Sequence, residues 1–481
     1  MRVAVVHGYF LHDSGSGIYV RELTRALVRL GHDVTLVCQE RQPERCDFID
    51  SSYVLDGANE SLELQRETPR RFSGSCRLVR PDLAGELLVY VEEGRFPPFE
   101  RAHVQAFQKA PADMRERYLE RNIHALRTTF DRFEPELVLA QHAIMQPYVV
   151  GRALAGRVPY VVTEHGSALN FSVRANPDLV PYALEGLAGA ARIATVSPGS
   201  RDDLIAWALE HGLDIEDRTL VMPPGIDADL FSPAIDRETA LSNLRGLVNI
   251  PEDFALSAAD DIVAYAGSLR PTKGVQHAVA AMPAISRLRG RPVRLLVAGG
   301  GPARRVLDEF GAVVDSGDAT AASRMVASDP LLQSPPEWGE VVGELPTGPG
   351  SRSAAFLGHV EHDQLAAVLA AADVCVVPSV FPEAAALVSV EGLAAGALPL
   401  AAHHSGMAAL TEFLAQSLGD GTFIGLEPGR DLTPLLAESV AHVLGAYPTK
   451  DPGFRRKVHD MALGRYPTWE TTARDYVSMA Q

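Results

Sequence analysis

The sequence predicts an α/β protein built from two tandem halves, each with a mostly parallel sheet covered by helices on both faces. At 481 residues the chain is too long for one ordinary hydrophobic core. Apolar strand-like runs alternate with segments of helical period in both halves, which indicates crossover connections between parallel strands. The alternation breaks near residues 224–260, where proline and acidic residues gather, so we expect the linker there.

The first half opens with a buried-type strand at Arg2–Val6, a helix at Gly17–Leu30 that Gly31 ends, and a strand at Val34–Cys38. Residues 41–98 are less regular, with one strand expected at Leu87–Val91. Regular alternation then returns. The expected helices are 101–109, 113–132, Tyr148–Leu154, Pro181–Ala190 and Ser200–Glu210, and the expected strands are Leu137–Ala140, Tyr160–Thr163 and Ile193–Val196.

The second half repeats the pattern, from a strand at Ile262–Ala266 through a helix from about Gly274. Residues 311–353 break the rhythm, and we expect an inserted loop there that carries a short helix at 319–327. The remaining expected strands are Val293–Ala298, Ala355–Leu357, Val374–Val377 and Leu398–Ala401; the remaining helices are 362–371, one that carries Glu391 and ends at Gly396, 431–445, 453–463 and 469–480.

The composition excludes several functional classes. A net charge of −17 disfavours partners such as nucleic acid and anionic lipid. No apolar run approaches the ~18–20 residues of a membrane span, and the first apolar strand is too short for a signal peptide. The cysteines lack metal-ligand spacing, so we expect buried thiols and a cytoplasmic location, with a homodimer left open. They are Cys38, Cys46, Cys76 and Cys375.

One segment is locally basic, with Arg66, Arg70, Arg71, Arg77 and Arg80. A solvated loop is the favoured interpretation, and an anion or acceptor site is the alternative.

A glycine motif, Gly15-Ser16-Gly17, lies between the first strand and the first helix. Glycines there let backbone N–H groups approach a phosphate or a sugar at the helix N-terminus. A dinucleotide fingerprint, with Glu40 as its ribose contact, is the rival interpretation. That fingerprint requires glycines directly after the strand and a third glycine, whereas residues 7–14 intervene here and position 20 is valine.

Thr163-Glu164-His165-Gly166 follows a predicted strand, which makes His165 a candidate for contact with a ligand. The alternative is a structural or surface histidine. His142, at another strand end, is a weaker candidate.

The segment Gly267–Gly274 joins the first strand and helix of the second half and carries Arg270 and Lys273. Two cations on a loop that feeds a helix N-terminus can bracket an anionic diphosphate. The alternative is a pair of solvated loop cations.

Glu383 and Glu391 lie on either side of a helix start after the strand Val374–Val377. A glycosidase pair must flank one bond at ~5–9.5 Å. Residues eight apart on a helix are ~12 Å apart, so the pair suits two ends of one elongated ligand. The alternatives are that Glu383 is an exposed loop acid and that Glu391 is a helix-surface acid.

Together these motifs resemble retaining glycosyltransferases with the GT-B fold, of the group 1 (family 4) type. The resemblance covers nearly the whole chain except about 41–100 and 311–353. It implies two Rossmann-like domains facing each other across a cleft. Residues 1–230 would bind the acceptor, 231–465 the nucleotide sugar, and the helix in 466–481 would cross back to the first domain.

The resemblance also implies roles for single residues. His165 and Glu383 would serve the transferred sugar, Arg270 and Lys273 the leaving diphosphate, and Glu391 the nucleotide ribose. The full set of implied donor-binding residues is Gly17, Gly267, Gly300, His359, Val360, Ala385, Ala386, Leu387 and Glu391.

The sequence departs from the family at two places. Ala384-Ala385-Ala386-Leu387 replaces Gly-Phe-Gly-Leu, and alanine keeps the N–H but disfavours positive φ. Residues 223–227 read Pro-Pro-Gly-Ile-Asp where the family has Pro-Asn-Gly-Val-Asp. The Asp-x-Asp at Asp227 and Asp229 lies in that linker element, and we predict no metal site.

We therefore expect a retaining transferase that moves a sugar from a nucleotide-diphosphate sugar to the hydroxyl of a sugar, lipid-linked or small-molecule acceptor. The nucleotide sugar is a co-substrate, and no further cofactor is expected. A sugar-nucleotide epimerase or hydrolase and a non-catalytic sugar-nucleotide-binding protein are the alternatives.

Overall fold

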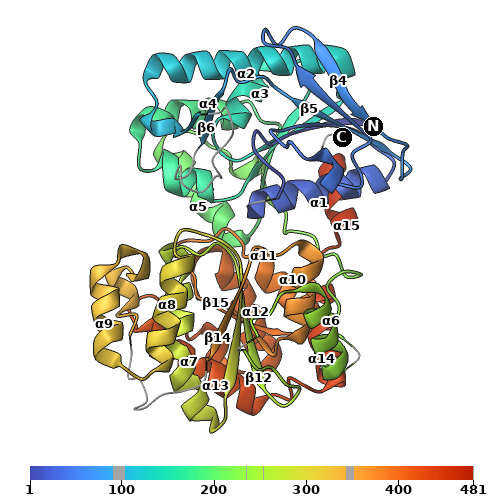
Figure 1. The fold of residues 1–481 in the computed structure, drawn as a ribbon. Helices are drawn as coiled ribbons and strands as arrows, with labels where there is room; N and C mark the ends of the chain where they lie inside the picture. The colour runs from blue at the N-terminus through green and yellow to red at the C-terminus, as the bar shows by residue number, and fades with distance from the viewer. Residues whose placement is uncertain (13, 90–102, 235, 253, 343–351, 480–481) are drawn as a thin grey trace. The chain divides into compact units, whose positions relative to one another are not determined.

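The chain divides into two compact units, each described here by itself. The computed structural model describes residues 1–12, 14–89, 103–234, 236–252, 254–342 and 352–479 (Figure 1). Unit 1 comprises Met1–Gly225 and Pro467–Gln481, and unit 2 comprises Ile226–Tyr466. The boundaries expected from the sequence follow residues 230 and 465.

Unit 1 contains a nine-stranded sheet in the order β11-β10-β9-β8-β1-β2-β5-β3-β4. Its pairs are parallel except β3 with β4, which is antiparallel. A separate parallel pair is formed by β6 and β7. The strands are β1 (Arg2–Val6), β2 (Asp33–Val37), β3 (Ser51–Leu55), β4 (Leu62–Glu67), β5 (Ser75–Arg80), β6 (Glu86–Val89), β7 (His103–Ala106), β8 (Leu137–Gln141), β9 (Tyr160–Glu164), β10 (Arg192–Thr195) and β11 (Thr219–Val221).

The centre of this sheet brings several strand ends to one edge. In β1, Val6 is in register with Val37 of β2 and with Ala140 of β8. These strands are almost wholly buried and apolar, as both faces of a parallel sheet require. Helices on the two faces supply the cover (Figure 1). They are α1 (Gly15–Arg29), α2 (Ala112–Phe133), α3 (Gln146–Leu154), α4 (Val180–Ala188), α5 (Pro198–Glu210) and α15 (Trp469–Ser478).

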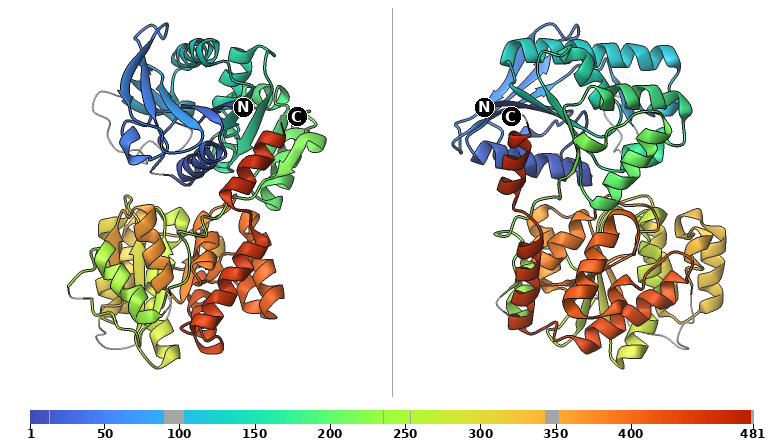
Figure 2. Two further views of the ribbon diagram at one scale, coloured as in Figure 1. Left: turned by 90° about the vertical axis from the view of Figure 1, so that its right-hand side faces the viewer. Right: turned by 180° about the vertical axis from the view of Figure 1, so that it is seen from behind.

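The last helix, α15, packs against α1 in unit 1, as the red and blue helices show in Figure 2. The Tyr476 hydroxyl is 3.0 Å from the Tyr19 hydroxyl and 3.0 Å from Thr163 Oγ1. The rings of Tyr19 and Trp469 meet edge to face at 5.1 Å. A Cβ on Gly225 would lie 2.5 Å from the Trp469 Cα, so only glycine permits this approach.

Unit 2 contains a five-stranded parallel sheet in the order β14-β13-β12-β15-β16, covered on both faces by helices. Its strands are β12 (Asp261–Ala266), β13 (Val293–Ala298), β14 (Ala354–Gly358), β15 (Val374–Val377) and β16 (Leu398–Ala401). Its helices are α6 (Arg237–Leu247), α7 (Val275–Arg289), α8 (Arg304–Asp315), α9 (Ala319–Ser328), α10 (His362–Ala371), α11 (Leu387–Ala394), α12 (Ala408–Leu418), α13 (Leu432–Ala446) and α14 (Pro452–Arg465).

Most predicted elements are confirmed, but unit 1 differs in two stretches. The helix expected at 101–109 is wrong, because β7 and a short 3-10 turn (Phe107–Lys109) occupy its described part. The described part of the stretch 41–98, which ends at residue 89, holds four strands, β3 to β6, rather than one. The strand expected at Leu87–Val91 corresponds to β6, and residues 90 and 91 lie outside the described residues.

Unit 2 corrects two further expectations. The stretch 224–260 is not a bare linker, because it contains α6 and because Ile226 and Phe231 belong to the unit 2 core. The stretch 311–353 does not begin as an inserted loop, because α8 continues to Asp315 and α9 follows it. The short helix expected at 319–327 is confirmed as α9. Proline and glycine near these helices made their helical spacing of apolar residues hard to recognise in the sequence. Residues 343–351 lie outside the described residues.

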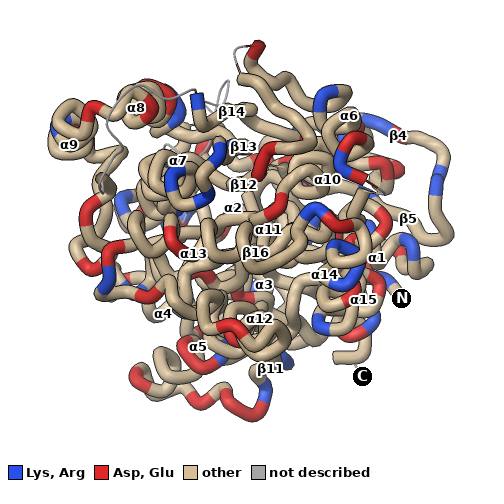
Figure 3. Tube along the Cα trace, turned by 90° about the horizontal axis from the view of Figure 1, so that it is seen from below, with Lys and Arg blue, Asp and Glu red and all other residues tan. Residues whose placement is uncertain are grey.

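Charged residues of both signs are interspersed along outer helices such as α8 and α14 (Figure 3). Among the described helices, none combines the length and apolar character needed to cross a membrane.

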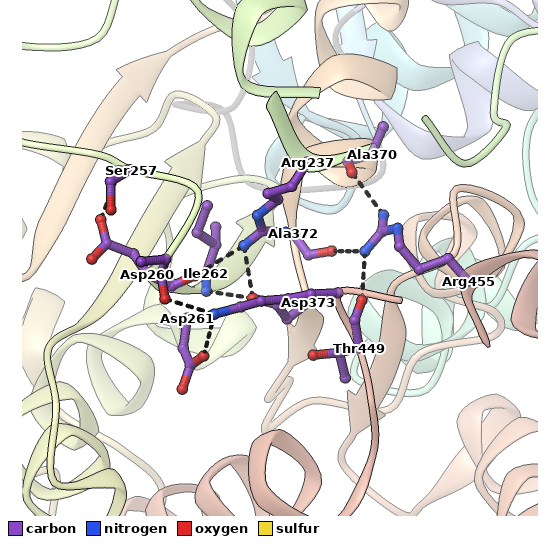
Figure 4. A network of polar contacts seen from close by, with 12 residues as sticks. Arg237, Ser257, Asp260, Asp261, Ile262, Ala370, Ala372, Asp373, Thr449 and Arg455 are labelled. Carbon is purple, nitrogen blue, oxygen red and sulfur yellow. Dashed lines mark hydrogen bonds and ion pairs between the residues drawn. The ribbon is translucent and has the colours of Figure 1, made fainter. Parts of the chain in front are cut away.

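Arg455 is a buried cation that joins three helices of unit 2. From α14 it donates to the carbonyl oxygens of Ala370 and Ala372, at the end of α10, each at 2.7 Å (Figure 4). It also donates to the carbonyl of Ala395, which caps α11, at 3.0 Å. Helix ends leave carbonyls without intrahelical partners, and a cation there also complements the helix dipole. Burial lowers the pKa of Arg455 to about 10, so it stays charged near neutral pH.

A second buried pair fixes the start of α6. Arg237 Nη2 lies 2.8 Å from Asp373 Oδ2, and the same oxygen accepts from the Ile262 amide at 2.7 Å (Figure 4). This contact connects α6 to β12 and to the turn before β15, which supports the assignment of residues 226–260 to unit 2.

Glu164, the last residue of β9, is a buried carboxyl in unit 1. Its Oε1 accepts a hydrogen bond from the Gly166 amide at 2.6 Å and so holds the turn that carries His165. Burial raises the pKa of Glu164 to about 7, against the opposing effect of that hydrogen bond.

We expect Arg455→Met to lower the free energy of unfolding by about 3 kcal/mol or more, because several buried carbonyls would lose their donor. Urea denaturation of the full chain measures this. The matched control is Arg456→Met, the exposed neighbour on α14, which should change stability by less than about 0.5 kcal/mol. Equal stability of the two variants would contradict the role given to Arg455.

We expect the contribution of Glu164 to stability to fall as pH rises. Its folded pKa lies above the unfolded value, so the folded state binds more protons and loses stability up to about pH 7. As the pH rises from 5.5 to 8.5, the free energy of unfolding of Glu164→Gln should therefore increase relative to that of the parent chain by on the order of 1–2 kcal/mol. Urea melts at both pH values test this, with exposed Glu210→Gln as control. Parallel pH profiles of parent and Glu164→Gln would disprove it.

Candidate functional site

The carboxyl edge of the unit 2 sheet is where the predicted donor-binding loops gather, as expected for a parallel sheet. These loops approach so closely that glycine is required at two points. A Cβ on Gly274 would overlap the carbonyl oxygen of Pro378, and one on Gly299 would overlap that of Gly267. The loops after β12, β13 and β15 are therefore packed together as one surface.

Lys273 and Glu383 meet on this surface although 110 residues separate them. The Lys273 ammonium forms an ion pair with Glu383 Oε1, and both side chains are partly accessible. The Ser379 hydroxyl donates to the same Oε1 at 2.7 Å, which fixes the carboxylate. The structure thus brings Lys273, which was predicted to bind the diphosphate, into contact with Glu383, which was predicted to serve the transferred sugar.

Two residues beside this pair were not predicted from the sequence. His404 Nε2 lies 2.7 Å from the Ser379 carbonyl oxygen, and burial lowers the pKa of its imidazole. The Tyr265 hydroxyl donates to the Ser268 carbonyl at 3.0 Å. Burial, and then the negative charge of Glu383, raises the pKa of that hydroxyl. The only sequence signal for His404 is its place shortly after a strand.

Glu391 is a buried acid on α11, so the interpretation as a helix-surface acid is wrong. His362 Nε2 lies 2.8 Å from Glu391 Oε1, and its ring packs against Phe231 at 4.9 Å. Burial, and then the charge of Glu391, raises the pKa of the neighbouring Cys375 thiol to about 12. His362 begins α10, and the sequence gave no reason to pair it with Glu391.

The alanine run before α11 has an ordinary backbone. None of Ala384, Ala385 and Ala386 is among the described non-glycine residues with positive φ, and Ala386 has φ −95°. Gly406 packs so closely on the Ala384 carbonyl that a Cβ there would overlap it, and its amide donates to the Glu383 carbonyl at 2.8 Å. Alanine is therefore accommodated without the left-handed conformation that the family's glycines allow. Leu387 is the first residue of α11.

The other predicted donor-binding residues of unit 2 lie on the same edge, whereas Gly17 belongs to unit 1. The Gly267 amide donates to the Ala298 carbonyl at 3.0 Å, and the Gly300 carbonyl accepts from Leu269 at 2.9 Å. Arg270 begins the 3-10 turn Pro271–Lys273. His359 is exposed and Val360 half-buried, directly after β14. Asp227 Oδ1 accepts from the Leu230 amide at 3.0 Å, a turn contact; the described residues contain no group of three or more side chains suited to hold a metal.

In unit 1, three neighbouring strands are each followed by a histidine at the carboxyl edge. His7 follows β1, His142 follows β8 and His165 follows β9. The rings of His7 and His142 are 5.4 Å apart, and those of His142 and His165 are 5.1 Å apart. His7 was missed in the sequence because no motif marks it.

Two of these histidines, His7 and His165, are held neutral. Burial, and then the charge of His7, lowers the pKa of His165 to about 3, and burial lowers the pKa of His7 to about 4. His165 Nε2 is 2.9 Å from Gln141 Oε1, so this nitrogen carries the hydrogen. His142 adopts φ 70°, a left-handed conformation that costs energy and is common at functional sites. His7 and His165 can therefore donate and accept hydrogen bonds as neutral imidazoles.

The predicted glycine motif is the start of α1. The Gly17 amide donates to Ser14 Oγ at 3.0 Å, and a Cβ on Gly17 would lie 2.5 Å from the Phe10 carbonyl oxygen. Close packing thus requires this glycine. Glu40, the ribose candidate of the dinucleotide interpretation, instead accepts from the amides of Leu11 at 3.1 Å and Gln42 at 2.9 Å.

Comparison with known sequences finds similarity over part of the chain. A family model described as Glycosyl transferase 4-like domain matches residues 14–225. A D-inositol 3-phosphate glycosyltransferase from Corynebacterium glutamicum (strain R) is 29% identical over 203 residues. That match spans 41% of this chain and only 39% of the relative.

Comparison with solved structures finds likeness over the whole chain. A sucrose-phosphate synthase from Thermosynechococcus elongatus has a TM-score of 0.62 at 19% identity, with 100% of this chain and 98% of that chain covered. HepE from Anabaena, in complex with UDP, has a TM-score of 0.58 at 14% identity, with 99% of each chain covered. Identities this low show the fold. They show that the chain has the GT-B fold, and residues 14–225 are similar to glycosyl transferase 4-like domains.

Proposed function

We propose that the chain transfers a sugar from a nucleotide-diphosphate sugar to a hydroxyl acceptor, with retention of the anomeric configuration and without a metal ion. The observation that carries the proposal is the Lys273–Glu383 ion pair at the carboxyl edge of the unit 2 sheet, where Ser379 donates a hydrogen bond to Glu383. An ammonium and a carboxylate thus lie side by side, as a phosphate–sugar junction requires.

The chemistry assigned to this edge is electrostatic. Cleavage of the sugar–phosphate bond develops negative charge on the leaving diphosphate, and Lys273, Arg270 and the α11 N-terminus would stabilise it. No side-chain cap is bound at that N-terminus in the described structure. The departing phosphate takes the acceptor's proton as the acceptor oxygen attacks the same face of the sugar. Each charge is therefore met by a fixed group without a metal.

Glu391 is assigned to the nucleotide ribose. A carboxylate accepts two hydrogen bonds, which suits a vicinal diol. Its contact with His362 fixes the orientation of the carboxylate before the donor binds. In unit 1, neutral His165 is assigned as a hydrogen-bond partner of a sugar hydroxyl, which its low pKa suits.

The named relatives agree with this proposal in chemical class. The Corynebacterium protein is named as a glycosyltransferase for D-inositol 3-phosphate, and HepE is described in complex with UDP. The four cysteines are free and buried thiols, which suits the reducing cytoplasm.

We expect Lys273→Met and Glu383→Gln each to lower kcat by about 10²–10³, because each removes a charge matched to the transition state. Screening the full chain with UDP-, GDP- and ADP-sugars by thermal shift identifies the donor. Turnover and NMR of the product's anomeric proton then measure rate and retention. Exposed Glu412→Gln on α12 is the control and should turn over normally. Unimpaired turnover in both variants would exclude this mechanism, and sugar release without transfer would indicate a hydrolase.

We expect Glu391→Gln to weaken donor binding about tenfold while kcat changes less, because it removes a charged acceptor for the ribose hydroxyls. Titration with the nucleoside diphosphate alone, followed by calorimetry, isolates this effect from chemistry. Glu412→Gln again serves as the control. An unchanged nucleotide affinity would move the ribose contact to another residue.

A further inference from the structure

We propose that His404 is a positioning residue for Glu383, and that Trp338, in the segment 330–342, holds His404 in place. The inference deepens the proposed function and rests on it, because Glu383 is assigned there to the transferred sugar. The family resemblance gives no role to His404, and it does not cover 311–353, the stretch that contains Trp338.

Ser379 is the residue through which His404 reaches Glu383. The Ser379 hydroxyl lies 2.7 Å from Glu383 Oε1 and 3.0 Å from the Thr272 carbonyl oxygen, so it lies between the loops after β15 and β12. The Val380 amide donates to the same Thr272 carbonyl at 3.1 Å. The position of Ser379 therefore determines where the Glu383 carboxylate lies.

The imidazole of His404 connects the loop after β16 to Ser379. Its Nε2 is 2.7 Å from the Ser379 carbonyl oxygen, and since a carbonyl cannot donate, this nitrogen carries the hydrogen. Burial lowers the pKa of His404, which favours this neutral form. Its Nδ1 is 3.3 Å from Ser405 Oγ and can accept from that hydroxyl. Ser405 has φ 49°, a left-handed conformation that is costly for serine and occurs at functional sites.

Trp338 restricts the orientation of the His404 ring. The two rings meet edge to face, with 5.3 Å between their centres. Trp338 is buried in the unit 2 core and ends the short 3-10 turn Pro336–Trp338, within the stretch that the sequence predicted as an inserted loop. An aromatic ring in this position limits the rotation of the imidazole, so the Nε2 hydrogen stays directed at Ser379.

The segment 330–342 is itself fixed by helices of unit 2. His277 Nε2, on α7, is 2.8 Å from Ser334 Oγ. The Thr433 hydroxyl, on α13, donates to the Val341 carbonyl at 2.8 Å. These contacts lie on either side of Trp338 in the chain, and they fix the backbone that carries its ring.

Gln276 connects this segment to the turn that carries Lys273. Its Nε2 donates to the Pro271 carbonyl at 3.0 Å and to the Gln333 carbonyl at 3.1 Å. The segment therefore contacts the loop of the cation as well as the loop of His404.

Kinetics of the full chain, with the donor found by thermal shift, test the positioning role. His404→Phe keeps a ring against Trp338 but cannot donate to Ser379, and we expect kcat to fall about tenfold, because small misplacements of a reacting group are costly. His404→Gln can donate from its amide nitrogen, so kcat should return to within about threefold of the parent. Affinity for the nucleoside diphosphate should change less than about twofold, because the ribose is assigned to Glu391.

The matched control is His403→Phe. His403 is the neighbouring half-buried histidine, and its Nδ1 lies 2.6 Å from Thr411 Oγ1. Its kcat should stay within about twofold of the parent. Circular dichroism melts confirm that each variant is folded, and His404→Leu takes the place of His404→Phe if the latter is not.

A double-mutant cycle tests the role of Trp338. We expect Trp338→Leu to lower kcat in the same direction as His404→Phe. Combining the two should add little to the loss, because both act through one contact. Additive losses in kcat would overturn the role given to Trp338.

A stability measurement requires neither donor nor turnover. In urea denaturation we expect the losses in His404→Phe and Glu383→Gln to be non-additive, because both variants weaken the contacts of Ser379. Additive losses, an unchanged kcat in His404→Phe, or a His404→Gln as slow as His404→Phe would overturn the positioning role and leave the transferase proposal standing. Non-additive losses in a chain that transfers no sugar would support the positioning of Glu383 and contradict the transferase.

Discussion

Close backbone contact between glycine loops is the constraint on which the candidate donor site depends. Gly274 lies against Pro378, and Gly299 against Gly267, at distances that a side chain would prevent. Because of these contacts, strands far apart in sequence present their following loops as one surface. The Lys273–Glu383 pair forms on that surface, so its geometry rests on residues that carry no functional group themselves.

Histidines have two distinct environments in this protein. In unit 1, His7 and His165 are neutral because burial lowers their pKa values. In unit 2, His362 is in contact with a carboxylate that it can orient. Neutral histidines are suited to hydrogen bonds with the hydroxyl groups of a ligand, whereas His362 holds the Glu391 carboxylate in one orientation. The predicted division of labour, acceptor binding on unit 1 and nucleotide-sugar binding on unit 2, is chemically consistent with this difference.

The sequence sufficed for features that are local. Strand and helix alternation, the glycine turns and the cations after a strand depend on a few consecutive residues, and the GT-B fold was predicted from the resemblance of these motifs to a known family. The contacts of His404 and Glu391 depend on residues far away in the chain, so no spacing indicated them. Short elements in irregular stretches were also missed: β7 was predicted as a helix, and α6 lay within the expected linker.

The return of α15 to unit 1 has a consequence for how the chain is assembled. Unit 2 is one continuous stretch, Ile226–Tyr466, whereas unit 1 is interrupted by it. In topological terms unit 2 is an insertion in unit 1. During synthesis from the N-terminus, Tyr19 and Thr163 can form their hydrogen bonds with Tyr476 only after unit 2 has been synthesised. Unit 1 is therefore begun before unit 2 and completed after it. A contiguous fragment can therefore contain all of unit 2, but none shorter than the chain contains all of unit 1.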